Sequence, residues 1–121
     1  MVVVYGISNC DTVRKARAWL AAERLESRFY DFRRDGLPEA VLVGWIREVG
    51  LEVLINRQGT TWRGLSEADR VLAVDARTAA RLLSLHPTLI KRPVVEWSDG
   101  LSVGFDAGAW AHRIQAGTAG R

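Results

Sequence analysis

Cysteine is scarce in this chain of 121 residues, in which Cys10 is the only one. A single cysteine excludes an internal disulfide framework and an intramolecular disulfide switch, because each needs two thiols in the same chain. The two histidines, His86 and His112, lie far from Cys10 in the sequence and form no ligand cluster with it. We therefore expect no bound metal.

Long apolar runs are also missing. The longest apolar stretches have the length of a strand, which is too short to span a bilayer. The N-terminus lacks the basic region, apolar region and small-residue cleavage site of a signal peptide. A cytoplasmic protein with no membrane partner is the expectation, and a reducing cytoplasm also suits an unpaired cysteine.

Charge of one sign is nowhere concentrated. The 17 basic and 14 acidic residues give a net charge of +3 and are scattered in mixed sign. Nucleic-acid binding favours a concentrated basic stripe with interleaved aromatic residues. We therefore expect no direct nucleic-acid binding, and local arginines are better suited to holding a small anion.

What the chain does have is a core: hydrophobic residues make up 48% of it. Their spacing, together with capping and turn residues, predicts a series of helices and strands. The expected strands are residues 1–7, 27–32, 94–97 and 101–105, and the expected helices are about 12–24, 39–49, about 66–72, about 75–85 and 107–114. The stretch 51–55 has no clear type, and 56–64 is predicted to be a loop.

This order is β-α-β, a helical middle, and then a hairpin and a helix. A crossover helix makes the first two strands parallel, and the hairpin most simply joins the same sheet. We predict an α/β fold with a four-stranded mixed sheet on the thioredoxin-like plan, carrying a helical insertion at about 36–90. The whole is expected to be one domain of residues 1–115, with residues 116–121 as a frayed tail.

Cys10 lies where the first predicted strand gives way to a helix. A thiol at that place meets unpaired backbone N–H groups and the positive end of the helix dipole, which favour the thiolate. Its neighbours Asn9 and Asp11 are polar, and three basic residues follow within two turns of the helix. The placement favours a reactive cysteine over the alternative of a small buried apolar side chain.

Three segments carry a family resemblance: 5–12 (YGISNCDT), 56–63 (NRQGTTWR) and 87–94 (PTLIKRPV). They resemble the ArsC/Spx family of glutaredoxin-like proteins and, within it, the small YffB branch of arsenate-reductase-related proteins. The likeness runs from about residue 2 to 114. It implies a thioredoxin fold with a redox-active cysteine and no bound cofactor. It also implies glutathione as co-substrate, with glutaredoxin as a partner.

The resemblance also implies roles for particular residues. Cys10 matches the family's nucleophile, and Arg92 matches the arginine before the family's proline, here Pro93, so a cis Arg92–Pro93 bond is expected. Where arsenate reductases place another arginine this chain has Asn56, followed by Arg57, and strand 101–105 offers no third. The substrate is therefore expected to be a small oxyanion or a disulfide, with arsenate itself left open.

A guanidinium beside the cysteine offers several fixed donors to an oxyanion or a carboxylate, so Arg92 is predicted to act with Cys10 in catalysis. Binding residues gather on loops held by a rigid scaffold. The predicted substrate- or glutathione-binding residues are Asn9, Thr12, Asn56, Arg57, Thr60, Arg63 and Pro93.

Two functions remain open. One is a glutathione-dependent thiol oxidoreductase of the arsenate reductase-like type, whose single cysteine forms and releases a mixed disulfide. The other is a non-catalytic Spx-like binding module that acts on the transcription machinery, with RNA polymerase as partner. Many Spx regulators carry a Cys-x-x-Cys switch, whereas the residue three after Cys10 is Val13.

Overall fold

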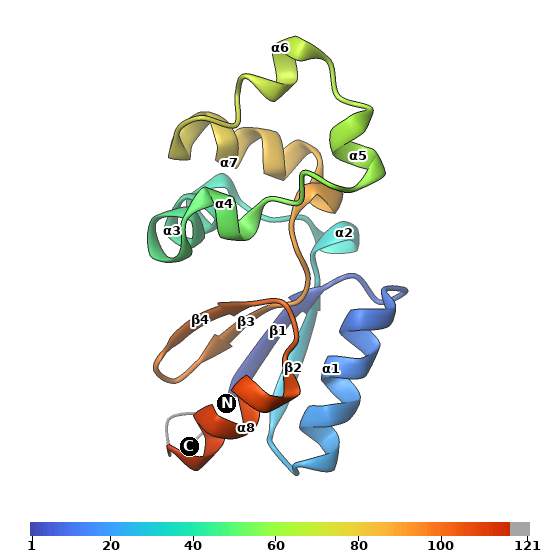
Figure 1. Ribbon diagram of the computed structural model, residues 1–121, viewed down its shortest axis with the longest axis vertical. Coiled ribbons are helices and arrows are strands. Elements are labelled where there is room, and N and C mark those ends of the chain that lie inside the picture. The colour runs from blue at the N-terminus through green and yellow to red at the C-terminus, as the bar shows by residue number, and fades with distance from the viewer. Residues whose placement is uncertain (117–121) are drawn as a thin grey trace. The chain divides into compact units, whose positions relative to one another are not determined.

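The computed structural model describes residues 1–116 and is shown in Figure 1. These residues form two compact units. Unit 1 consists of Met1–Asp35 and residues 92–116, and unit 2 is Gly36–Lys91. The description as a single domain stays a prediction, and residues 117–121 of the predicted frayed tail lie outside the described residues. None of the helices formed by residues 1–116 has the length and apolar content needed to cross a lipid bilayer.

Unit 1 is built on a four-stranded mixed sheet in the order β2-β1-β3-β4. Its strands are β1 (Val2–Gly6), β2 (Ser27–Asp31), β3 (Val94–Trp97) and β4 (Gly100–Val103). β1 pairs with β2 in parallel, and the other two pairs are antiparallel. Its helices are α1 (Asp11–Ala22), the short α2 (Phe32–Asp35) and α8 (Ala107–Gln115). The predicted α/β fold with a four-stranded mixed sheet is confirmed.

One face of this sheet holds the core of unit 1. The buried cluster alternates along the strands and continues onto α1 and α8; its members are Val2, Val4, Ala16, Leu20, Val95, Trp97 and Trp110. The rings of Trp97 and Trp110 meet nearly edge to face, with centroids 4.9 Å apart. Aromatic pairs of this geometry add to the stabilisation from burial, so the indoles fix α8 against the sheet.

Close contact between β1 and α1 depends on Gly6. A Cβ built at Gly6 would lie 2.7 Å from Cγ2 of Val13, which is closer than carbon atoms approach in proteins. Val13 is fully buried in the first turn of α1. The absence of a side chain at Gly6 therefore lets the start of α1, where Cys10 lies, pack directly on the end of β1.

Unit 2 is helical. It contains α3 (Glu39–Val49), α4 (Leu51–Leu54), α5 (Thr60–Arg63), α6 (Glu67–Arg70), α7 (Ala76–Leu85) and a 3-10 turn at Pro87–Leu89. The bounds of α3 match the prediction, and the side chain of Asp75 caps α7 by accepting from the backbone N–H groups of Arg77 and Thr78.

Two predictions for unit 2 need correction. The stretch 56–64 is not only a loop, because Thr60–Arg63 forms one helical turn that starts at Gly59. A single polar turn buries no apolar stripe, so it leaves no periodicity to detect. The helix predicted at 66–72 is also shorter, since only Glu67–Arg70 is helical, capped by the Ser66 hydroxyl.

Candidate active site

Cys10 is the N-cap residue of α1. Its backbone is extended (φ −90°, ψ 125°), and its carbonyl oxygen accepts the N–H of Arg14 at 3.0 Å. Its own N–H donates to the Ile7 carbonyl at 3.1 Å, which closes the loop between β1 and the helix. The thiol is partly exposed. It therefore stands at the open end of α1 and is accessible from solvent.

Opposing effects act on the acidity of this thiol. Burial raises the pKa of Cys10, but the backbone N–H of Val13, the guanidinium of Arg92 and the N–H of Thr12 together lower it below its ordinary value. The sulfur makes no full capping hydrogen bond with α1, so the N–H groups act on it largely through their dipoles. The net effect favours the thiolate, the form in which cysteine is a nucleophile.

Arg92 reaches the sulfur because of the strand order. β3 pairs antiparallel with β1, and Val94 lies opposite Tyr5, so the start of β3 is beside the end of β1 that leads to Cys10. The Arg92–Pro93 peptide bond is cis, as predicted. The Pro93 carbonyl accepts the N–H of Gly104 at 2.8 Å, which ties this corner to the end of β4.

Two of the three basic residues that follow Cys10 in the sequence have other partners. Arg14 forms an ion pair with Asp11, and the guanidinium of Arg17 lies 4.1 Å from the centroid of the Phe29 ring. Arg92, which is distant in sequence, is the cation that lowers the pKa of Cys10. Strand pairing, rather than sequence proximity, thus supplies the positive charge.

Asp31 braces the loop before Cys10, and sequence reasoning missed it. It ends β2 and lies opposite Gly6 in the parallel register. One carboxylate oxygen accepts the N–H of Ser8 at 3.2 Å, and the other accepts those of Arg33 and Arg34 at 3.0 and 3.1 Å. Burial raises the pKa of Asp31, but these N–H groups and the Ser8 hydroxyl lower it below its ordinary value. The only sequence signal was an aspartate at the end of a strand parallel to β1.

Replacing Asp31 with Asn is expected to destabilise the protein at pH 7. Asn offers one acceptor oxygen and an NH₂ group, so it leaves one set of N–H donors unpaired, at a cost of about 0.5–1.5 kcal/mol. Because the folded-state pKa is lowered, the stabilisation by Asp31 is present above its unfolded pKa of about 4 and is lost as pH falls through the folded value. Urea unfolding of both proteins should show a difference at pH 7 that shrinks at about pH 3.

Asp35→Asn is the matched control, because Asp35 pairs with the exposed Arg34 side chain and with no backbone group of the Cys10 loop. It should change the free energy of unfolding by less than about 0.5 kcal/mol. Equal effects of the two substitutions, or a pH-independent effect at Asp31, would contradict the bracing role.

The remaining predicted binding residues fall in two groups. Asn9 and Thr12 flank Cys10 in unit 1, and Thr12 contributes its backbone N–H to the lowered pKa. The other group lies on one segment of unit 2: Asn56, Arg57, Thr60 and Arg63. The glutathione-binding role of both groups stays a prediction.

The segment of unit 2 is held by its own polar contacts. The Asn56 side chain accepts the N–H of Gln58, and the Arg63 guanidinium donates to the Gln58 carbonyl at 2.8 Å. Arg57 forms an ion pair with Glu52 and lies 5.2 Å from the Trp62 ring centroid. Asn56, Arg57 and Gln58 also line a pocket of about 230 Å³ together with Lys91.

A four-stranded mixed sheet with a cysteine at the start of its first helix, beside an arginine and a cis proline, defines a thioredoxin-like protein. Comparison with known proteins shows to which family within this class the chain belongs. The ArsC family model matches residues 5–112, and the chain belongs to the ArsC family.

Two solved structures illustrate the relationship. The YffB protein is 38% identical, with a TM-score of 0.86 over 93% of this chain and 97% of its own. An arsenate reductase (ArsC) related protein from Brucella melitensis is 39% identical, with a TM-score of 0.72 over 94% of each chain. The resemblance to the YffB branch is confirmed.

A more distant relative is a transcriptional regulator. Global transcriptional regulator Spx 2 of Bacillus anthracis is 25% identical over 108 residues, which cover 88% of this chain and 81% of its own. The expected relation to the Spx branch therefore holds at lower identity.

Proposed function

We propose that this protein is a glutathione-dependent thiol oxidoreductase of the arsenate reductase-like type. The observation that carries the proposal is the placement of Cys10 at the start of α1, where two backbone N–H groups and Arg92 lower its pKa. A lowered pKa at a partly exposed sulfur gives the two properties that a thiol nucleophile needs, ionisation and access. Membership of a family related to arsenate reductases supports the same chemistry.

The proposed reaction is thiol–disulfide exchange. The Cys10 thiolate attacks one sulfur of a disulfide, forming a mixed disulfide while the original S–S bond breaks and the other half leaves as a thiolate. An external thiolate, from glutathione or glutaredoxin, then attacks the mixed disulfide and releases Cys10 as thiolate. With no second cysteine in the chain, the resolving thiol has to come from outside.

In this scheme Arg92 stabilises negative charge at the sulfur before attack and when Cys10 leaves again. Charge-assisted hydrogen bonds from a guanidinium also suit an oxyanion, so a small oxyanion remains a candidate substrate beside disulfides. Asn9, Thr12, Pro93 and the predicted residues of unit 2 are proposed to bind glutathione or the substrate. Assays with arsenate and with mixed disulfides, each supplied with glutathione and glutaredoxin, would separate the two substrates.

Treatment of the reduced protein with glutathione disulfide is expected to add one glutathione to each chain. The modification should be absent from Cys10→Ser, because the hydroxyl is not a nucleophile at neutral pH. Intact-protein mass spectrometry measures both results. Glutaredoxin should then remove the group faster than thioredoxin does.

One outcome of the same experiment would contradict the proposal. If Cys10 stays unmodified at a pH where free thiols react readily, the oxidoreductase proposal fails. Control spectra of Cys10→Ser exclude adducts that form elsewhere on the chain.

The second candidate is a non-catalytic Spx-like binding module, favoured by the similarity to Spx 2. Its partner would be RNA polymerase, as part of the transcription machinery. A Cys10 pKa at or above the free-thiol value of ~8.5, with no glutathione exchange, would favour this module. A lowered pKa with turnover would favour the enzyme.

A further inference from the structure

A groove of about 380 Å³ lies beside the loop that leads to Cys10. It is lined by Ile7, Ser8, Asn9, Asp31, Arg33 and Arg34, all from unit 1. Asn9 links the groove to the reaction, because it lines the groove and is bonded directly to Cys10. Neither Arg92 nor the predicted binding residues of unit 2 line this groove. The groove is therefore a surface to which the proposed reaction has so far assigned no part of the substrate.

Of the charged side chains that line the groove, some already have hydrogen-bond partners within the protein and one does not. Asp31 directs both carboxylate oxygens at backbone N–H groups. The Arg34 guanidinium donates to both oxygens of Asp35, at 3.3 and 3.2 Å. The exposed Arg33 side chain has no hydrogen bond or ion pair with any other residue in the part of the chain that the structure describes. Arg33 is therefore the cation that remains available to a ligand.

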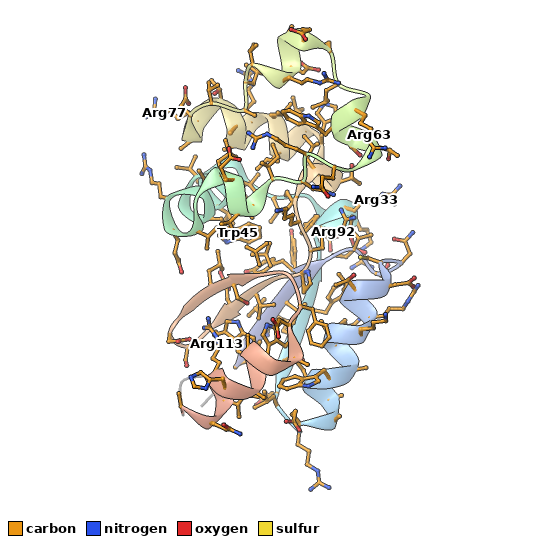
Figure 2. The ribbon with its side chains drawn as sticks, viewed as in Figure 1. Arg33, Trp45, Arg63, Arg77, Arg92 and Arg113 are labelled. Atoms are coloured by element: carbon orange, nitrogen blue, oxygen red, sulfur yellow. The ribbon has the colours of Figure 1, made fainter. Side chains whose placement is uncertain are left out.

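From this arrangement we infer that the groove binds a carboxylate of the disulfide or thiol that reacts at Cys10, with Arg33 as its main charged partner. The inference rests on the proposed function. A molecule joined to the Cys10 sulfur extends away by a few bonds, and the groove begins one residue away. Figure 2 shows Arg33 on α2 and Arg92 where the chain enters β3. The two arginines thus have separate tasks: Arg92 acts on the sulfur and Arg33 on the body of the substrate.

If Arg33 binds a carboxylate, the protein should prefer substrates that carry a negative charge. Acidic thiols and disulfides, such as the glutathione pair with its free carboxylates, should react faster than neutral or cationic ones of similar intrinsic reactivity. A guanidinium binds a carboxylate through parallel charge-assisted hydrogen bonds. At an exposed site the attraction is modest and depends on salt, so the preference should weaken as ionic strength rises.

The test compares Arg33→Glu with Arg28→Glu. Arg28 is an exposed arginine on β2 that does not line the groove. Because both variants replace an arginine with a glutamate, they change the net charge by the same amount. Each full-length protein is reacted with three disulfides: anionic glutathione disulfide, neutral bis(2-hydroxyethyl) disulfide and cationic cystamine. Mass spectrometry follows the rate of mixed-disulfide formation at Cys10.

Arg33→Glu is expected to slow the reaction with glutathione disulfide about five- to tenfold at low ionic strength, because reversing an exposed charge replaces attraction with repulsion. The reaction with bis(2-hydroxyethyl) disulfide should change less than about twofold, and that with cystamine should become faster. Arg28→Glu should leave the ratio of the three rates near that of the unmodified protein.

Alkylation of Cys10 by neutral iodoacetamide separates the two possible failures. If Cys10 alkylates readily and exchanges with all three disulfides, but Arg33→Glu keeps the preference of the unmodified protein for glutathione disulfide, the groove assignment is wrong and the proposed function stands. The groove assignment is also wrong if Arg28→Glu alters the preference as much as Arg33→Glu. If Cys10 exchanges with none of the disulfides, the proposed function fails and the inference fails with it.

Discussion

Replacement of Arg92 with Ala is expected to raise the pKa of Cys10 and to slow its alkylation at neutral pH. The guanidinium acts on the sulfur both by its charge and as a hydrogen-bond donor. A positive charge beside a thiolate favours the ionised form, so its removal lowers the thiolate fraction at every pH below the pKa. We therefore expect the alkylation rate at about pH 7 to fall several-fold.

Arg17→Ala is the matched control. It also removes one positive charge, here from α1, but Arg17 packs over the Phe29 ring and is not among the groups that shift the pKa of Cys10. The measurement is the rate of iodoacetamide alkylation as a function of pH. The profile of Arg92→Ala should move to higher pH and meet the unmodified profile where both thiols are ionised, whereas Arg17→Ala should keep its midpoint. Identical midpoints in all three proteins would refute the role of Arg92.

The second large effect is expected at Gly6. Gly6→Ala would place a Cβ 2.7 Å from one methyl group of Val13 and 3.1 Å from the other. Val13 is fully buried, so it cannot turn its branched side chain into free space. Overpacking of this kind costs about 1–3 kcal/mol. Since Val13 lies in the first turn of α1, the relaxation should also shift Cys10 relative to Arg92 and slow alkylation.

Gly44→Ala provides a control of opposite sign. Gly44 lies inside α3, and a Cβ added there would meet no atom within 4 Å, so alanine should stabilise the protein by about 0.5–1 kcal/mol. Urea unfolding at neutral pH measures both changes. The double variant Gly6→Ala/Val13→Ala should recover part of the loss, because the smaller side chain leaves room for the added methyl group. A Gly6→Ala protein as stable as the original would show that β1 and α1 do not meet closely.

Much of the fold could be predicted from the sequence because its signals are local. The β-branched strand at the N-terminus and the helix at 39–49 each depend on a pattern within a few residues, and each formed close to where it was predicted. The cis bond at Arg92–Pro93 came from the family resemblance. No periodicity in the sequence indicated it.

What could not be predicted depends on pairing between distant segments. Asp31 and Ser8 meet only because β2 lies parallel to β1 in one register, with Gly6 opposite Asp31. A shift of one residue would turn that carboxylate to the other face of the sheet. The groove beside Asn9 has the same origin, since one wall comes from the loop after β1 and the other from the end of β2 and from α2. The single turn at Thr60–Arg63 was missed for a different reason, because it is too short to show a period.

The position of unit 2 in the sequence has an evolutionary consequence. Gly36–Lys91 is inserted between the end of α2 and Arg92, yet the N–H groups of Thr12 and Val13 and the guanidinium of Arg92, which lower the pKa of Cys10, all belong to unit 1. Changes in the length or composition of the insertion can therefore accumulate without removing any of these three groups. A lineage can in this way replace the side chains that the inserted helices offer, while the groups that favour the thiolate are kept.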